Sequence, residues 1–531
     1  MTSPRDTAPG EVACHQAPPQ SLEQLEQQRA LVARAYDPEL LRLAGQQMVE
    51  QLASHLSQLQ RREGPVHHWC EPEQNVRAAR ETLDDDAAWH GSKGSESGDL
   101  AKQLPDNEQL AAQFVSLAAQ SLQRGQNLQH PRYIGHQVPA PLPLAGLFDL
   151  AMAVTNQVQG VYEMGPWAVA TERAVIDRLG ETIGLPRGEF GGLVTSGGSL
   201  ANLTALLTAR NVRVADSWTM GLPADRRPVL VAHQETHYSV ARAAGVLGLG
   251  AAQVVPVALD RERRMDPAAL DRTLAQLKAS DVPVVAVVSV AGATPTGAYD
   301  PLSAIADVCE RHEVWLHVDA AHGGAACLSD RHRHLLDGLS RADSIVLDAH
   351  KMMFMPALCA FVFYRDRRHR FATFEQSAPY LFDPTAPGMA EFDNAMVTME
   401  CTKRAAAIGL WAVWSLFGDR LFAALVDTVF ETARTLHRLL DEAPDFDVLA
   451  EPTSNIVVFR HTPDASLTDT QLDELQWSLR RRVIQNGAAY LTQTKLDGRC
   501  YLRSTIMNPL TTEADLRDCL AAIRAASTLA D

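Results

Sequence analysis

The chain has 531 residues, of which 46% are hydrophobic and 21% are charged. This length supports a large buried core divided into two or three structural units, and the composition is that of a folded globular protein. The formal charge of −16 and the lack of a long Lys/Arg run argue against nucleic acids and anionic membranes as partners.

The cysteines and the first residues indicate where the protein works. The eight cysteines are scattered with no CxxC pair, which is typical of reduced thiols in a cytoplasmic protein and gives no support for a zinc site. Residues 1–20 are polar and contain proline, so we expect a disordered leader and no secretory signal. The longest uncharged runs, near 191–209 and 282–299, contain Gly, Ser, Thr, Asn or Pro and indicate buried strands and turns, not membrane spans.

The pattern along the chain predicts three folded parts. Apolar residues recur at helical spacing from 21 to about 62, which predicts amphipathic helices. The acidic, then Gly/Ser-rich stretch 84–99 predicts an exposed loop. We assign 21–125 to an N-terminal helical segment, 126–410 to a large domain and 411–531 to a small C-terminal domain.

The large domain carries the signal of an α/β fold. Short apolar, β-branched runs alternate with helical stretches between about 190 and 365, and they predict buried strands at 228–232, 282–290, 314–319, 344–349 and 357–364. This alternation is typical of a mostly parallel sheet. In the C-terminal part, strand-like 455–459 and 501–506 alternate with helical 468–485 and 511–527, which predicts a small α+β domain.

One strand end has the composition of a phosphate-binding loop. The strand at 192–194 runs into Ser196, Gly197, Gly198 and Ser199 ahead of an apolar helix, and the backbone N–H groups at a helix start suit a phosphate. Taken alone, a glycine turn between strand and helix is the more ordinary explanation. The loop lacks a Walker ending, and the glycines of 245–250 lack dinucleotide spacing, so neither an NTP nor NAD is predicted.

Two other strand ends carry charged groups that are rare in buried positions. Asp319 and Lys351 each end a predicted strand, and each alone would be explained as a structural ion pair. Together with the glycine loop they match the needs of pyridoxal 5'-phosphate (PLP), which takes a lysine for its Schiff base, a carboxylate for its pyridinium nitrogen and a phosphate cup. His237, after the strand at 228–232, adds a flat ring that can stack on the pyridine, although a lone histidine there is more often a turn or core residue.

The chain resembles the group II PLP-dependent amino acid decarboxylases, the family of glutamate, aromatic amino acid, cysteine sulfinate and diaminobutyrate decarboxylases. The resemblance runs from about 128 to 510 and rests on nine blocks in order: HPRYIGHQ (130–137), YEMGP (162–166), TSGGSLAN (195–202), THYS (236–239), AGATPTGAYD (291–300), HVDAAHGG (317–324), ADSIVLDAHK (342–351), APYLF (378–382) and LRSTIMNP (502–509).

The resemblance implies a fold-type I PLP enzyme with Lys351 bound to the cofactor, Asp319 at the pyridinium nitrogen and His237 stacked on the ring. It further implies a set of contacts to the rest of the cofactor: Ser196, Gly197, Gly198, Ser199 and His350 around the phosphate, Thr294 near the ring substituents and Ala321 on the opposite ring face. Gln137 and Arg503 match positions near the substrate in the glutamate enzymes. Tyr380 matches a mobile-loop tyrosine that favours protonation at Cα over oxidative deamination.

Four positions depart from the family pattern. Leu200 replaces a frequent Glu, Ala293 a common Thr, and Asp348 the Asn of glutamate and aromatic enzymes, which puts one phosphate contact in doubt. His322 follows Asp-Ala-Ala where other residues are frequent, and packing is its simplest role.

The function that follows is α-decarboxylation of an L-amino acid to an amine and CO2, with an acidic substrate of the glutamate or aspartate type as the first expectation. Diaminobutyrate, cysteine sulfinate, aliphatic and aromatic amino acids stay open, as do a PLP-dependent aldehyde synthase or aminotransferase and a non-catalytic scaffold with this fold. The resemblance also implies a homodimer, in which the aperiodic stretch 366–397 acts as a lid over the neighbouring subunit's site.

Overall fold

The computed structural model describes residues 21–84, 106–223, 226–374 and 391–528. The predicted leader, most of the loop 84–99 and Tyr380 therefore lie outside the described residues. The chain divides into two units, one formed by residues up to 57 with 70–125 and the other by 58–69 with 126–531.

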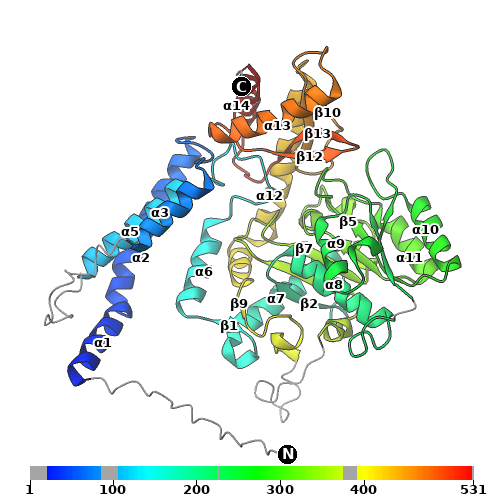
Figure 1. The fold of residues 1–531 in the computed structure, drawn as a ribbon. Helices are drawn as coiled ribbons and strands as arrows, with labels where there is room; N and C mark the ends of the chain where they lie inside the picture. Colours follow the sequence, from blue (N-terminus) through cyan, green and yellow to red (C-terminus); the bar gives the residue numbers. More distant parts are fainter. Residues whose placement is uncertain (1–20, 85–105, 224–225, 375–390, 529–531) are drawn as a thin grey trace, which may run out of the picture. The chain divides into compact units, whose positions relative to one another are not determined.

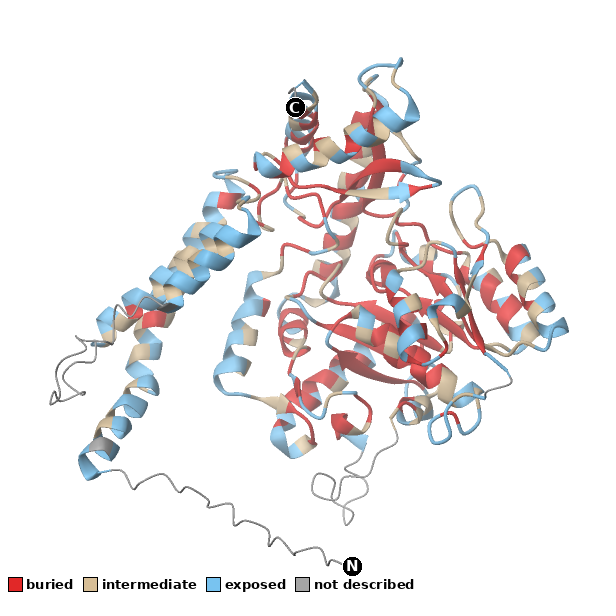
Figure 2. Cartoon of the chain, viewed as in Figure 1, coloured by how far each residue is buried: buried red, intermediate tan, exposed pale blue. Residues whose placement is uncertain are grey.

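The first unit is built from the N-terminal helices α1 (Leu22–Ala35), α2 (Pro38–Gln60), α3 (Pro72–Asp84) and α5 (Asn107–Arg124). Helices α1 and α2 form where the helical spacing predicted them. Helix α5 begins with a capping box, in which the Asp106 side chain accepts from the Gln109 N–H and the Gln109 side chain accepts from the Asp106 N–H. Most residues of these helices are exposed or half-buried (Figure 2).

The second unit contains a seven-stranded sheet in the order β2-β8-β7-β6-β5-β3-β4 (Figure 1). Strand β8 runs antiparallel to both of its neighbours, and every other pair is parallel, which confirms the predicted α/β fold with a mostly parallel sheet. The strands span β2 (Gly191–Thr195), β3 (Val229–His233), β4 (Val254–Val257), β5 (Val284–Val290), β6 (Leu316–Asp319), β7 (Ser344–Asp348) and β8 (Ala360–Tyr364).

The sheet is buried on both faces, as its continuous apolar runs predicted (Figure 2). Successive side chains alternate between two cores: Phe361 and Phe363 of β8 face one, and Val362 and Tyr364 face the other. Helices α7 (Pro166–Ile183), α10 (Pro267–Ala279) and α11 (Leu302–His312) contribute to the first core, and α8 (Gly198–Arg213) and α9 (Tyr238–Val246) contribute to the second.

The C-terminal part has its own antiparallel sheet in the order β10-β11-β13-β12. Its elements are β10 (Phe446–Val448), β11 (Ile456–His461), α13 (Asp469–Gln485), β12 (Thr492–Leu496), β13 (Arg499–Thr505) and α14 (Glu513–Thr528). The long helix α12 (Ile408–Asp441), kinked at Gly418, precedes this sheet. By length and composition α12 could cross a membrane, but Phe422, Val426 and Phe430 lie in the main core, as expected of the central helix of a folded domain.

Two further elements complete the second unit. Helix α6 (Pro143–Val154) precedes a short two-stranded ribbon of β1 (Val158–Gln159) and β9 (Lys403–Arg404). The ribbon joins residues from the start and the end of the large domain. The boundary near residue 410 that we predicted between large and small domains falls at the beginning of α12 and stays a prediction.

Candidate active site

Six strands of the large sheet have their carboxyl ends at one edge. Because every strand except β8 runs in the same direction, the carboxyl ends of β2, β3, β4, β5, β6 and β7 lie along the same side of the sheet. The loop with Gly197 follows β2, His237 follows β3, Thr294 follows β5, Asp319 ends β6 and Lys351 follows β7. The structure thus brings together the residues that the sequence singled out at separate strand ends.

The loop after β2 leaves the start of α8 open to an anion. Gly197 has φ of 109°, a conformation that favours glycine, and it caps α8 without a side-chain hydrogen bond. The first N–H groups of a helix have no partner within the helix, and the helix dipole makes this end positive. Ser196 is exposed and donates to Glu400 Oε1 at 3.1 Å, and Ser199 is also exposed. This arrangement suits a phosphate.

Asp319 is buried and held by two donors. Its carboxylate accepts from Asn202 Nδ2 at 2.9 Å and from the Ala321 N–H at 3.1 Å. Asn202 lies one turn into α8, so the same helix that begins at the glycine loop also fixes the carboxylate. Such donors stabilise the ionised form of a carboxyl group.

A chain of hydrogen bonds that starts at Trp315 fixes the orientation of the Asn202 side-chain amide. Trp315 Nε1 donates to Ser344 Oγ at 2.9 Å, so the Ser344 hydroxyl is left to donate to His317 Nδ1, 2.8 Å away. His317 Nε2 then donates to Asn202 Oδ1 at 3.0 Å, which turns the Asn202 amide nitrogen toward Asp319. Burial lowers the pKa of His317 to about 4, so its ring stays neutral, as this chain of donors requires.

His237 belongs to the same network through Ser239. Asn202 Nδ2 donates to Ser239 Oγ at 3.0 Å, and the Ser239 hydroxyl is 2.8 Å from His237 Nδ1. His237 also caps α9, because its side chain accepts from the Ser239 N–H. Burial lowers the pKa of His237, the charge of Lys351 lowers it further, and Asp319 opposes both. A neutral, fixed imidazole therefore faces the sheet edge.

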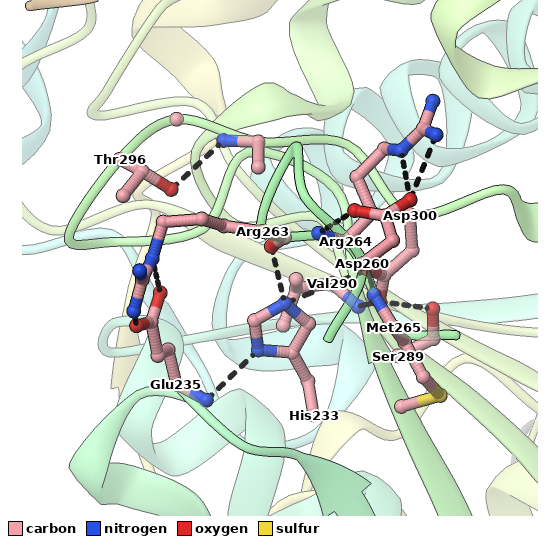
Figure 3. A network of polar contacts seen from close by, with 12 residues as sticks. His233, Glu235, Asp260, Arg263, Arg264, Met265, Ser289, Val290, Thr296 and Asp300 are labelled. Atoms are coloured by element: carbon pink, nitrogen blue, oxygen red, sulfur yellow. Dashed lines mark hydrogen bonds and ion pairs between the residues drawn. The ribbon is translucent and has the colours of Figure 1, made fainter. Parts of the chain in front are cut away.

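The loop that carries Thr294 is closed at its base by Asp300 (Figure 3). Asp300 accepts from the Val290 N–H and Ser289 Oγ, each at 2.8 Å, and from the Met265 N–H at 2.7 Å. His233, at the end of β3, lies 3.6 Å from the same carboxylate, and its Nδ1 accepts from the Glu235 N–H.

Arg263 extends this network in two directions. It pairs with Glu235 and, at 2.7 Å, with Asp497 in the turn between β12 and β13. Arg263 thereby links the segment after β3 to the turn between β12 and β13.

Lys351 lies beside a second buried carboxyl group. Its Nζ is 3.3 Å from Asp348 Oδ2, and His350 Nε2 is 3.5 Å from the same oxygen. Asp348 is 2% exposed, and burial raises its pKa against the opposing effect of Lys351 and His350. A Cβ added to Gly198 would lie 2.7 Å from Asp348 Oδ2, so Asp348 lies directly against the first residue of α8.

Arg503 is a buried cation with little to neutralise it. It lies on β13 and is 6% exposed, and its Nη1 donates to Thr492 Oγ1 at 3.2 Å, whereas Nε and Nη2 have no hydrogen-bond partner among the described residues. Burial lowers its pKa to about 10, which leaves it charged at neutral pH. Gln137 also has a buried amide nitrogen without a partner in the described chain.

His322 connects the lysine side of the site with the arginine side. Its Nε2 donates to Asn455 Oδ1 at 2.7 Å, since the Asn455 amide nitrogen is engaged by the Ile506 carbonyl. Burial lowers the pKa of His322 to about 3, and the charges of both Lys351 and Arg503 contribute. Both cations therefore lie within electrostatic reach of the His322 ring.

Sequence reasoning missed the residues that act behind these groups. Asn202, Ser239 and His317 lie within the blocks TSGGSLAN, THYS and HVDAAHGG, respectively, but were given no role in the sequence analysis. Asn455 lies outside the blocks. Their hydrogen-bonding side chains at buried positions were the available signal. Thr294 follows β5 and Ala321 follows β6, and their roles toward the cofactor stay predictions; Tyr380 is outside the described residues.

Comparison with known proteins supports one family. Residues 100–462 match the pyridoxal-dependent decarboxylase conserved domain. Cysteine sulfinic acid decarboxylase of Mus musculus is 30% identical over 430 residues, which cover 79% of this chain and 85% of the mouse protein. The enzyme of that name from Rattus norvegicus is 31% identical over 399 residues, which cover 73% and 80% of the two chains.

Solved structures agree in fold. The crystal structure of mouse CSAD in apo form matches with a TM-score of 0.79 and 26% identity, covering 92% of this chain and 98% of that one. The glutamate decarboxylase domain of diaminobutyrate-pyruvate transaminase and L-2,4-diaminobutyrate decarboxylase from Vibrio parahaemolyticus matches with a TM-score of 0.72 and 26% identity, covering 90% of this chain and 94% of that one. Oryza sativa TDC with PLP and tryptamine, at 23% identity and a TM-score of 0.80 over 93% of this chain and 98% of that one, shares the fold.

Proposed function

Since the chain belongs to the pyridoxal-dependent decarboxylase family, and is thus a PLP-dependent amino acid decarboxylase, we propose that it acts on a short acidic L-amino acid, such as aspartate, glutamate or cysteine sulfinate. The products are the corresponding amine and CO2. The single observation that carries the acidic substrate is the buried, under-neutralised guanidinium of Arg503.

The residues at the sheet edge fit PLP. The uncapped start of α8 suits its phosphate, and the carboxylate of Asp319, oriented by hydrogen bonds from Asn202 and the Ala321 N–H, suits a protonated ring nitrogen. When bound, the cofactor supplies an electron sink for the pair left behind as CO2 departs. We assign Lys351 to hold the cofactor, His237 to stack on its ring, Ala321 to the other face, Thr294 to the ring substituents, and Ser196, Gly197, Gly198, Ser199 and His350 to the phosphate.

Arg503 supports an anionic group on the substrate. A buried charge without a counter-ion is costly, and two idle N–H-bearing nitrogens add the cost of unmade hydrogen bonds. A carboxylate or sulfinate oxygen would remove both costs, because a guanidinium binds such groups through paired hydrogen bonds. The idle amide nitrogen of Gln137 offers another donor to an anion.

An anionic side chain of the substrate would fit less well beside Lys351 than beside Arg503. Asp319 and Asp348 already supply negative charge near Lys351, so a substrate side chain with a carboxylate gains most on the Arg503 side. Relatives named as cysteine sulfinic acid decarboxylases bear an acidic substrate in their names, which supports the same class. Diaminobutyrate, whose side chain is cationic, is disfavoured by repulsion from Arg503.

We further propose that the enzyme works as a cytoplasmic homodimer. The cysteines in the described chain are unpaired, as expected in a reducing compartment. Helix α6 exposes an apolar stripe of Leu144, Leu147, Leu150 and Val154, and a second copy of the chain would cover it. Tyr380, as the loop tyrosine that favours protonation at Cα, keeps its predicted role as part of this proposal.

The test is CO2 release from a panel of L-amino acids by purified protein with added PLP. We expect release from acidic members and none from the Lys351→Ala variant, with amine as the co-product. Ammonia and peroxide would indicate an aldehyde synthase, and a keto acid would indicate an aminotransferase. A purified protein that binds no PLP would support the scaffold alternative, and preference for aromatic or aliphatic substrates would refute the acidic class.

A further inference from the structure

Asp348 occupies an unusual position for a carboxyl group. It ends β7, is 2% exposed, and its Oδ1 has no hydrogen-bond partner among the described residues. Its Oδ2 lies against Gly198 at the start of α8, where we place the cofactor's phosphate. An acid thus lies next to the place where another anion binds.

The charges around Asp348 come from four elements. Lys351 and His350 follow it on the chain and favour its ionised form, and Asp319 at the end of β6 opposes that form. His237 before α9 and Cys359 before β8 are also within electrostatic reach. Lys351, at 3.3 Å, is the nearest cation, so the ionised form of Asp348 depends chiefly on the lysine.

Cofactor binding removes this support. Once Lys351 is committed to PLP, its ammonium no longer neutralises Asp348, and the phosphate brings further negative charge. Both changes disfavour a buried carboxylate. A carboxylate can only accept hydrogen bonds, whereas a neutral carboxyl group can donate one to a phosphate oxygen.

We propose that Asp348 binds the phosphate of PLP as a neutral acid, so that loading of the cofactor takes up one proton from solvent. The proton bonds to a carboxylate oxygen of Asp348, and no other bond is made or broken by this step. The inference rests on the placement of the phosphate at the start of α8. It assigns a donor role to the residue whose departure from the family's asparagine left that contact in doubt.

The test compares the pH dependence of PLP binding to apoenzyme in wild type and in Asp348→Asn. A group that gains a proton on binding weakens the ligand by up to tenfold per pH unit above its pKa in the free protein. The ratio of the wild-type Kd to the Asp348→Asn Kd should therefore rise about tenfold or more between pH 6 and pH 9. Absorbance of the bound cofactor gives the Kd without any assay of activity. Parallel curves for the two proteins would overturn the proposal.

Pyridoxal lacks the phosphate, so it separates the effect of the phosphate on Asp348 from the effect of Lys351. With pyridoxal the ratio of the two Kd values should rise less steeply with pH than with PLP, because Asp348 then loses the charge of Lys351 but meets no second anion. A ratio that rises as steeply as with PLP would assign the effect to Lys351 alone and overturn the proposal. Asp330→Asn is the matched control: it removes the same charge from a 96% exposed side chain and should follow the wild type.

A measurement on the wild type alone covers the case in which Asp348→Asn does not fold. Calorimetry in buffers of different ionisation enthalpy counts the protons taken up at pH 8, where the phosphate of free PLP is a dianion. PLP should take up more protons than pyridoxal, by at most about one per chain, because only PLP places a second anion beside Asp348. Equal counts would contradict the inference, and they would leave the proposed function standing if the same protein releases CO2 from acidic amino acids.

Discussion

At the scale of single residues, the site is defined by charged groups whose neutralisation is incomplete. Within the described residues, Asp319 has two hydrogen-bond donors, one oxygen of Asp348 has no partner, and two nitrogens of Arg503 have none. Sequence reasoning found Asp319 at the end of a predicted strand, and Asp348 and Arg503 through the family resemblance. It could not show which of their polar atoms have hydrogen-bond partners, because those partners, such as Asn202 for Asp319 and Thr492 for Arg503, are distant in the sequence.

Arg503→Met tests the role of the buried cation in substrate binding. The change should lower kcat/KM for an acidic substrate about 10- to 100-fold, the cost of a charge-assisted hydrogen bond of ~1.5–3 kcal/mol. Steady-state kinetics on the PLP-loaded enzyme give the ratio, and Arg503→Lys should restore part of the loss. Because the wild-type cation is buried and poorly paired, thermal stability should not fall with activity. Unchanged kinetics in Arg503→Met would remove Arg503 from the substrate site.

At the scale of elements, helix α8 joins the parts of the site. Its first turn faces Asp348, and Asn202 in its second turn bonds to Asp319, to Ser239 beside His237, and to His317 on β6. The strands themselves could be predicted because strands buried on both faces read as continuous apolar runs. Strand β4 was missed because it is short and contains Pro256, which is tolerated at the edge of a sheet.

His317 on β6 predicts how stability depends on pH. Its folded pKa of about 4 lies below the ordinary value of 6.5, so the unfolded chain binds the proton more tightly and acid favours unfolding. Between pH 7 and pH 5 this residue should cost about 2 kcal/mol of stability. Thermal midpoints at the two pH values should fall less in His317→Gln than in wild type. An equal fall in both proteins would show that another group controls the acid sensitivity.

At the scale of the whole molecule, the fold places six strand ends along one edge of the large sheet, and Arg503 lies on β13 of a second, antiparallel sheet. The mostly parallel sheet and the family were predictable from motifs and periodicity. The hydrogen-bond network between α8, β6 and β7 was not, since periodicity gives the face on which a side chain lies but not its partner. The exposed apolar stripe of α6 suggests that the working unit is larger than one chain.

We propose that Arg503 selects substrates with an anionic side chain, and a comparison of two acids with their amides tests this selection. L-aspartate and L-asparagine, and likewise L-glutamate and L-glutamine, differ little in shape but differ in charge. Their kcat/KM values should be measured with the same PLP-loaded wild-type enzyme. We expect kcat/KM for the preferred acidic amino acid to exceed that for its amide by at least about tenfold, which corresponds to a free-energy difference of ~1.4 kcal/mol. Equal values, or a preference for the amides, would contradict it and would leave Arg503 to bind the α-carboxylate that all amino acids share.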